Sequence, residues 1–456
     1  MSLIHDQSCE CSTSPLELFR VRPTQTAVEK TSEVEYQPLT SLRDSAPVEF
    51  YIPASTDEFI DLKNSKLHVT FKIVKNNGTE CGADDVVAPI NDIYNGLWSN
   101  VEFFMNDRLV SHSNNTHGYT SMISHLIHDS EESLHSERQM RLLFKDTAGQ
   151  LDTTSAKIPN PDQLINGFHT DNDGTAVADQ GNHGLHYRYL YTRGSQPTTV
   201  IGPLRIDMCE QERYLPSGIS LKLRFHRQKD NYMLMSAAAN YKVKLMEAYL
   251  MMRKVKTSPG VQLGIADALL KSPAKFLITR KDTKVVAVPN GFQNFVKDNI
   301  FLGQLPKRAV IGIVHPNAFS GSVTRNPYNF LHKDVNFVQL YVDGEPVLAK
   351  ALKPNVSDKQ YLRCFETLFR GYDRLDGGKS CIIKREDWDK GYSLFSFDLT
   401  ADYDDDDHYP IIKHGNLRLE MNFANALDSA INIIIYAEFD NIIEITSERN
   451  VQFDYT

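Results

Sequence analysis

The 456-residue sequence is poor in cysteine, has no excess of basic residues and contains no long apolar run. Six scattered cysteines are too few for a disulfide framework in a chain of this size, so we expect free thiols. The formal net charge of −9 argues against a chain that mainly neutralises nucleic acid phosphates. No stretch reaches the about 18 apolar residues of a membrane-spanning helix, and early acidic residues argue against a signal peptide. The cytoplasm or nucleus is the expected compartment.

Local signatures of catalysis are also missing. The sequence has no Walker A loop, no GxGxxG, no HExxH and no glycine-flanked nucleophile elbow. We therefore predict that the chain is not an enzyme and that it uses no cofactor. A glycosidase stays an alternative, because its two carboxylates come from separate strands and leave no local motif.

Alternation of apolar and polar residues with a period of two dominates the sequence from Val48 onward. Residues 67–74 are typical of a half-buried strand, and the Asn-Asn-Gly at 76–78 predicts a turn after it. Helical spacing is confined to short stretches, the clearest being 119–128, 261–270 and 359–369. These patterns predict an all-β protein with short accessory helices.

Internal duplication is the most informative feature of the sequence. Residues 101–110 and 338–347 align without a gap as a strand, a two-residue turn and a second strand. Further pairs follow in the same order: 204–207 with 395–398, 221–225 with 417–421, and 241–252 with 431–442. A shared order of this kind indicates two copies of one unit. Two all-β copies with about eight strands each predict two tandem jelly-roll β-sandwiches, a double jelly roll.

The duplication divides the chain into three parts. Residues 1–45 are polar and aperiodic, which predicts an N-terminal arm. The first jelly roll is expected at 46–255, with a long polar insertion at about 147–196, and the second at 256–456.

An acidic run at 402–407 is the first candidate for a metal site. It supplies enough carboxylates for a hard cation, and its weak candidate ligands are Asp404, Asp405, Asp406 and Asp407. The run lacks the spacing of an EF-hand and lies between two expected strands. We therefore favour a solvated loop over a metal site.

Three other clusters have ordinary explanations. His183 and His186, with His169 and Asp171–Asp173, match no zinc spacing, and surface histidines in the insertion are the simpler interpretation. Cys9 and Cys11 lie in the arm without a second ligand pair. The aromatic and basic residues at 187–193 could stack bases or sugars, but we favour a strand with aromatic cross-strand pairs, which explains them without a ligand.

Several blocks of the sequence resemble the major capsid proteins of Polinton (Maverick) elements and adintovirus-like viruses. In the first half they are 47–64, Leu97–Phe103, Ser113–Thr116 and Phe144–Gly149; in the second half they are 301–306, 326–330, 341–345, 391–400 and 436–440. The resemblance runs in order over about residues 40–450 and leaves out the arm.

This resemblance implies a viral structural protein. Three copies would form a homotrimer, a capsomer of pseudo-hexameric outline, and such trimers would tile an icosahedral virion capsid. The implied partners are neighbouring trimers and a penton protein, without sequence-specific binding of nucleic acid. Synthesis is expected in the host cytoplasm, with assembly there or in the nucleus. A lectin-like β-sandwich that binds carbohydrate through its loops is the alternative.

Overall fold

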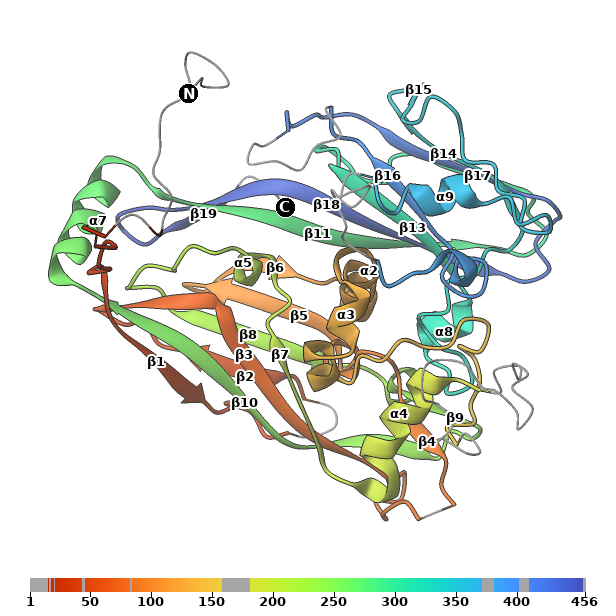
Figure 1. The fold of residues 1–456 in the computed structure, drawn as a ribbon, viewed down its shortest axis with the longest axis horizontal. Coiled ribbons are helices and arrows are strands. Elements are labelled where there is room, and N and C mark those ends of the chain that lie inside the picture. Colours follow the sequence, from red (N-terminus) through yellow and green to blue (C-terminus); the bar gives the residue numbers. More distant parts are fainter. Residues whose placement is uncertain are drawn as a thin grey trace.

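The computed structural model describes residues 15, 18–19, 21–42, 46–82, 84–157, 181–370, 381–401 and 410–453. Two β-sandwiches lie side by side, and helix α7 (Pro259–Lys271) connects them at one end of the molecule (Figure 1). A single hydrophobic core runs through both sandwiches.

Two four-stranded antiparallel sheets, β1-β10-β3-β7 and β2-β8-β5-β6, form the first sandwich, and a short ribbon, β4-β9, accompanies them. The strands are β1 (Val28–Tyr36), β2 (Val48–Ile52), β3 (Glu58–Lys75), β4 (Val87–Pro89), β5 (Trp98–Met105), β6 (Arg108–His112), β7 (Thr198–Pro203), β8 (Leu221–Arg227), β9 (Leu234–Ser236) and β10 (Tyr241–Thr257).

The second sandwich repeats this arrangement with the sheets β11-β18-β13-β16 and β12-β17-β14-β15, and β19 pairs with β18. Its strands are β11 (Ala274–Val288), β12 (Asn294–Lys297), β13 (Arg308–Val314), β14 (Val335–Val342), β15 (Glu345–Pro346), β16 (Leu394–Asp398), β17 (Leu417–Phe423), β18 (Ile431–Ile445) and β19 (Val451–Phe453). We number the eight strands of each sandwich from 1 to 8 along the chain, leaving out β4, β9 and β19. In this numbering both sandwiches have the sheet orders 1-8-3-6 and 2-7-4-5. This shared order is that of a jelly roll, so the predicted double jelly roll is confirmed.

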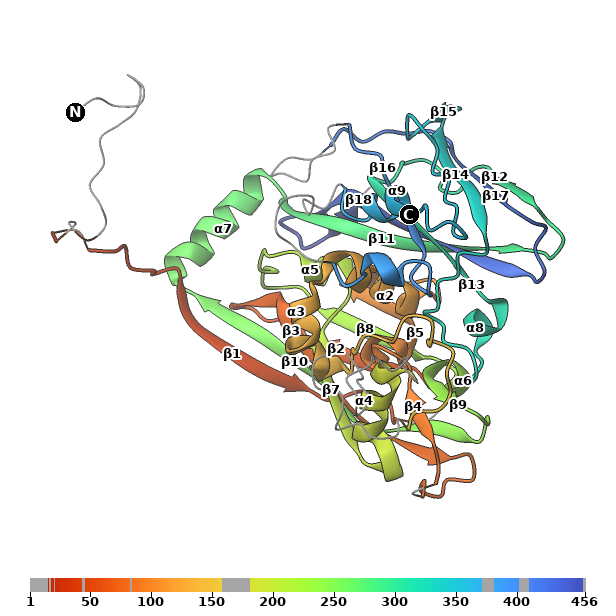
Figure 2. The same ribbon diagram turned by 45° about the vertical axis from the view of Figure 1, so that its right-hand side comes forward.

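Short helices connect the strands. The α-helices are α1 (Ile93–Gly96), α2 (His117–His128), α3 (Glu131–Leu134), α4 (His183–Thr192), α5 (Asp207–Glu210), α6 (Asp230–Met233), α7, α8 (Pro316–Ser320) and α9 (Leu362–Glu366), and the 3-10 helices are η2 (Glu137–Arg141), η4 (Arg193–Ser195) and η5 (Arg385–Asp387). The predicted helices at 119–128, 261–270 and 359–369 correspond to α2, α7 and α9 (Figure 2). Among the described residues, no helix is both long and apolar enough to cross a membrane.

The aligned hairpins have equivalent turns. Between β5 and β6, Asn106 and Asp107 have φ values of 46° and 62°, and between β14 and β15, Asp343 and Gly344 have φ values of 52° and 91°. Positive φ at both central positions matches the twist of the flanking strands, and Asn, Asp and Gly tolerate it best. The turn residues therefore explain why this pair of segments was recognisable in the sequence.

One strand, β1, lies within the residues 1–45 that were expected to form the N-terminal arm. β1 pairs with β10 from Val28 opposite Thr257 to Tyr36 opposite Leu250, so part of residues 1–45 belongs to the first sandwich. The strand lies at the edge of its sheet and has no fully buried side chain, which is why it carries no core signal. We therefore propose that the first domain begins at Val28 and ends with β10 at Thr257.

The interpretation of the aromatic segment as a strand was wrong. Residues 187–191, expected as a strand, lie in helix α4, where Leu185 and Arg188 are fully buried. Arg188 Nη2 donates to Asp146 Oδ1 at 2.7 Å, and this ion pair fixes α4 against the preceding segment. Of the aligned segments 204–207 and 395–398, the first follows the end of β7 and the second lies in β16.

Candidate functional site

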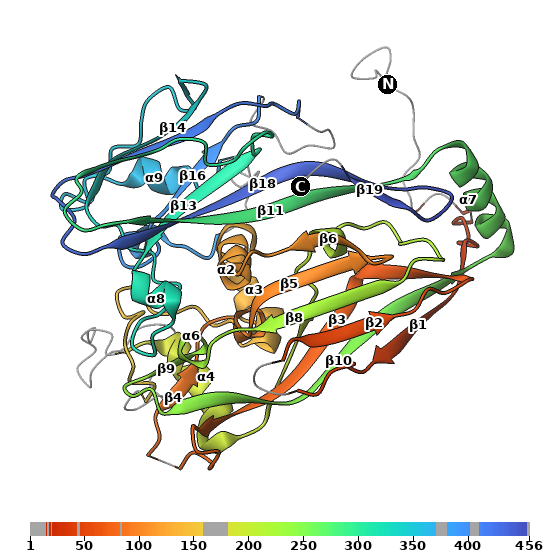
Figure 3. The same ribbon diagram turned by 180° about the vertical axis from the view of Figure 1, so that it is seen from behind.

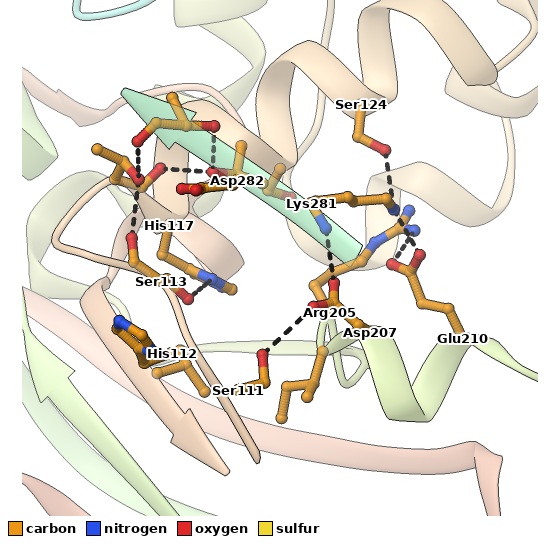
Figure 4. A pocket seen from close by; sticks show the side chains of 16 residues that line it. Ser111, His112, Ser113, His117, Ser124, Arg205, Asp207, Glu210, Lys281 and Asp282 are labelled. Carbon is orange, nitrogen blue, oxygen red and sulfur yellow. Dashed lines mark hydrogen bonds and ion pairs between the residues drawn. The ribbon is translucent and has the colours of Figure 1, made fainter. Parts of the chain in front are cut away.

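A polar pocket lies at the junction of the two sandwiches, where α2, β6 and α5 of the first face β11 of the second (Figure 4). Its volume is about 30 Å³. Since a cavity needs roughly 10–15 Å³ to hold one water, this pocket has room for one or two waters rather than for an organic substrate. The arrangement is therefore that of a polar contact between the two sandwiches.

Helix α2 and the residue before it present a polar stripe to the second sandwich. Its residues recur every four positions, which places them on one side of the helix: Thr116, Thr120, Ser124 and His128. The Thr120 Oγ1 atom lies 2.8 Å from Thr283 Oγ1 on β11, and His128 Nε2 lies 2.9 Å from Glu438 Oε1 on β18. The stripe therefore hydrogen-bonds the outer face of the β11-β18-β13-β16 sheet.

An ionic cluster completes the junction. Lys281 of β11 forms an ion pair with Glu210 of α5, and Arg205 Nη1 donates to the same carboxylate at 3.2 Å (Figure 4). Asp207 Oδ1 accepts the backbone N–H of Lys281 at 3.3 Å. Burial raises the pKa of Asp207 to about 7. Burial would also raise the pKa of Glu210, but Lys281 and Arg205 outweigh it and lower that pKa to about 2.

Two buried histidines lie behind this cluster. Burial, reinforced by the charge of Arg205, lowers the pKa of His117 to about 4 and holds the pKa of His125 well below its usual range. His125 Nδ1 lies 2.6 Å from Asp129 Oδ2. Both imidazoles are therefore neutral at pH 7. Within the described ranges, no group of three His, Cys, Asp or Glu side chains could hold a metal ion.

A wider groove of about 400 Å³ lies on the second sandwich, between β13, β16 and the β14–β15 hairpin. Glu345, Asp398 and Asp440 line it with carboxylates, and two of these three, Asp398 and Asp440, have fixed contacts, unlike the free pair that a glycosidase would require. Asp440 Oδ1 is 2.8 Å from Lys307 Nζ. Asp398 Oδ1 accepts the Thr400 N–H at 2.9 Å and the Thr400 hydroxyl at 2.6 Å. These contacts tie Asp398 and Asp440 to the strand ends.

The sequence-predicted candidates are not brought together at either place. The acidic run with Asp404, Asp405, Asp406 and Asp407 lies outside the described residues, and so do Cys9, Cys11, His169 and Asp171–Asp173. His183 and His186 lie at the start of α4. His186 is buried, with Nδ1 2.8 Å from the Ala156 carbonyl oxygen, so its interpretation as a surface histidine was wrong.

The polar site at the junction was not predicted from the sequence. One signal was readable: α2 has polar residues every four positions, Thr120, Ser124 and His128, which marks a second contact side beside its apolar residues. The partners on β11 and β18 had no such signal, because a lysine or glutamate in a strand is normally read as facing solvent.

Comparisons with known proteins identify this architecture. No protein-family model matches the chain. An uncharacterized protein of Caenorhabditis elegans is 20% identical over 443 residues, which cover 94% of this chain and 98% of the relative.

Solved structures match over nearly the full length. A chain in the cryo-EM structure of the Sputnik virophage is similar with a TM-score of 0.61 and 12% identity, covering 99% of this chain and 94% of that one. The Faustovirus major capsid protein gives 0.58 and 10%, covering 93% and 92%. The mavirus major capsid protein gives 0.54 and 10%, covering 100% and 97%. The chain therefore has the double jelly-roll fold of viral major capsid proteins.

Proposed function

We propose that the protein is a major capsid protein, a structural subunit that trimerises into pseudo-hexameric capsomers that tile an icosahedral shell. The observation that carries this proposal is the strand-for-strand duplication of a jelly roll, matched from end to end by the major capsid proteins of Faustovirus and mavirus. The junction between the sandwiches supports a structural role, because its charged groups are engaged with one another.

Duplication suits such a shell for a geometric reason. Three chains with two similar sandwiches each present six similar sides, so a closed threefold oligomer can occupy a lattice position with six neighbours. Assembly then depends on many surfaces of modest area rather than on one deep pocket.

We further infer that the protein belongs with the Polinton, Maverick and adintovirus lineage. The blocks that resemble this lineage lie along both sandwiches, and a relative from a nematode is consistent with elements resident in animal genomes. The partners we propose are neighbouring trimers and a penton protein, and the location is the virion. The net charge of −9 supports a shell protein that does not itself bind nucleic acid by sequence.

The solution mass of the purified chain tests this proposal. Size exclusion with light scattering is expected to give three times the chain mass, because the proposed capsomer is a trimer. A monomer that persists across salt and pH would contradict it. In that case binding to a glycan array would support the lectin-like alternative.

A further inference from the structure

The aromatic segment that was expected as a strand gives helix α4 an exposed aromatic side. The inner side of the helix, with Leu185 and Tyr189, is buried. The outer side carries Tyr187, Leu190 and Tyr191, which are 37%, 36% and 48% exposed. Because the segment is a helix, the cross-strand pairing that was expected to explain these tyrosines does not exist.

A third ring joins the two exposed tyrosines. Helix α4 packs beside β4, at the end of the first sandwich away from α7 (Figure 3). There the ring centroid of Phe144 is 5.6 Å from that of Tyr187 and 6.0 Å from that of Tyr191, with interplanar angles of 26° and 21°. The rings of Phe144, Tyr187 and Tyr191 are therefore nearly parallel, and we call them the aromatic platform.

Buried polar groups hold the aromatic platform in place. The Phe144 N–H donates to Asn91 Oδ1 at 2.9 Å, and the Phe144 carbonyl oxygen accepts Arg188 Nη1 at 3.1 Å. Arg188 is fully buried and also donates through Nε to the Pro89 carbonyl oxygen at 2.9 Å. Since Arg188 belongs to α4, it fixes the helix and Phe144 relative to each other. The platform is thus preorganised, which lowers the entropy lost when a ligand binds.

The charges of the helix indicate which class of ligand fits. Among Asp, Glu, Lys and Arg, α4 contains only Arg188, which points inward and is buried. Sites for single-stranded nucleic acid combine aromatic rings with a positively charged groove, and the single exposed cation that follows the helix, Arg193, does not make such a groove. Uncharged rings with hydroxyl groups at their edges suit a neutral ligand that is apolar on its faces and polar at its edges. A sugar ring has this character.

We propose that the aromatic platform binds a neutral oligosaccharide, with sugar rings stacked on Tyr187 and Tyr191. The two tyrosines are four residues apart and lie on the same side of the helix, so successive sugar units of one ligand stack on both. The proposal adds a ligand to the structural role of the chain and does not depend on the trimer. Solution mass and sugar binding are separate measurements, so either can fail without the other.

Saturation-transfer NMR on the full-length chain tests the proposal. The probes are maltotetraose, cellotetraose and triacetylchitotriose, and the unaltered chain is expected to transfer saturation to the ring C–H protons of at least one of them. Tyr187→Ala with Tyr191→Ala should raise the dissociation constant of that probe at least about tenfold, because the stacking rings are lost. Tyr187→Phe with Tyr191→Phe should retain most of the binding, because the rings remain.

Tyr51→Ala is the matched control, because Tyr51 is a tyrosine on β2 that is 44% exposed. This variant should bind like the unaltered chain. Tyr191→Ala alone replaces the double variant if the latter changes the circular dichroism.

Four results would overturn the proposal. The first two are no saturation transfer to any of the probes, and equal transfer in the double alanine variant. The third is tighter binding of a short single-stranded oligothymidylate through the same rings, which would assign the platform to nucleic acid. The fourth is a smaller solution mass of the alanine variant than of the unaltered chain, which would make the platform a contact between copies.

Discussion

Core side chains pack directly against the backbone of Gly312 in β13. A Cβ atom there would lie 2.6 Å from Phe330 Cδ1 and 2.9 Å from Leu394 Cδ2, both in the buried core. Gly312→Ala should therefore lower the free energy of unfolding by about 1–3 kcal/mol, the usual cost of overpacking. Chemical denaturation measures the change.

Gly264 in α7 provides the control for this substitution. A Cβ atom at that position meets nothing within 4 Å. Gly264→Ala should raise the stability of the helix by up to about 1 kcal/mol, because alanine loses less backbone freedom than glycine on folding. Equal effects at the two glycines would contradict the packing described around β13.

The carboxyl group of Asp207 predicts a pH dependence of stability. Burial raises its pKa from 3.8 to about 7, so the folded protein binds a proton that the unfolded chain lacks between about pH 4 and pH 7. The stabilisation that this group contributes is complete below about pH 4 and is lost as the pH rises through 7. Asp207→Asn should become more stable relative to the unaltered chain across this window, by on the order of 4 kcal/mol.

Thermal unfolding at a series of pH values measures this difference. Asp267→Asn on the exposed side of α7 is the control and should leave the pH profile unchanged. A pH profile of Asp207→Asn that runs parallel to that of the unaltered chain would show that Asp207 does not titrate in this window.

At the scale of elements, β1 marks the point at which the N-terminal arm ends and the first sandwich begins. Deleting residues 2–24 should leave the melting temperature of the monomer unchanged, because Gln25 Oε1, which accepts the Val28 N–H at 2.7 Å, and β1 are retained. Deleting residues 2–40 should lower it, because the eight paired positions between β1 and β10 are lost. Equal melting temperatures would contradict the place of β1 in the sheet.

The long insertion at 147–196 is only partly separable from the sandwich. Its two ends carry the buried residues Leu151, Ala156 and Leu185. Replacing residues 158–180 by a Gly-Ser linker should therefore preserve the cooperative unfolding of the chain, whereas deleting 150–195 should abolish it. Denaturation followed by circular dichroism distinguishes the two, and a folded product of the larger deletion would show that α4 is dispensable.

The strands that were predicted in most detail are those with two independent signals. β3 combines strict alternation with an Asn-Asn-Gly turn, and both hairpins combine alternation with turn residues that adopt positive φ. β1 has no buried face, and α4 is held by the Arg188–Asp146 ion pair. Neither element therefore has a periodic pattern of apolar core residues in its sequence. The candidate site needed tertiary structure, because Lys281 and Glu210 are 71 residues apart and each resembles an ordinary surface charge.

At the scale of the whole molecule, the duplicated sandwiches have the same strand order but differ in how their equivalent strands are covered. Residues 431–441 of β18 are buried throughout, whereas exposed residues such as Lys244 and Met246 alternate with buried ones along β10. Two equivalent sandwiches in one chain suit the proposed trimer, because three chains then present six similar sides.

Electron microscopy of the purified full-length chain tests this account most directly. It predicts particles with threefold symmetry and six lobes, two from each copy, and class averages in which one sandwich of each copy contacts the other sandwich of its neighbour. Single two-lobed particles at every protein concentration, with no six-lobed class, would contradict it.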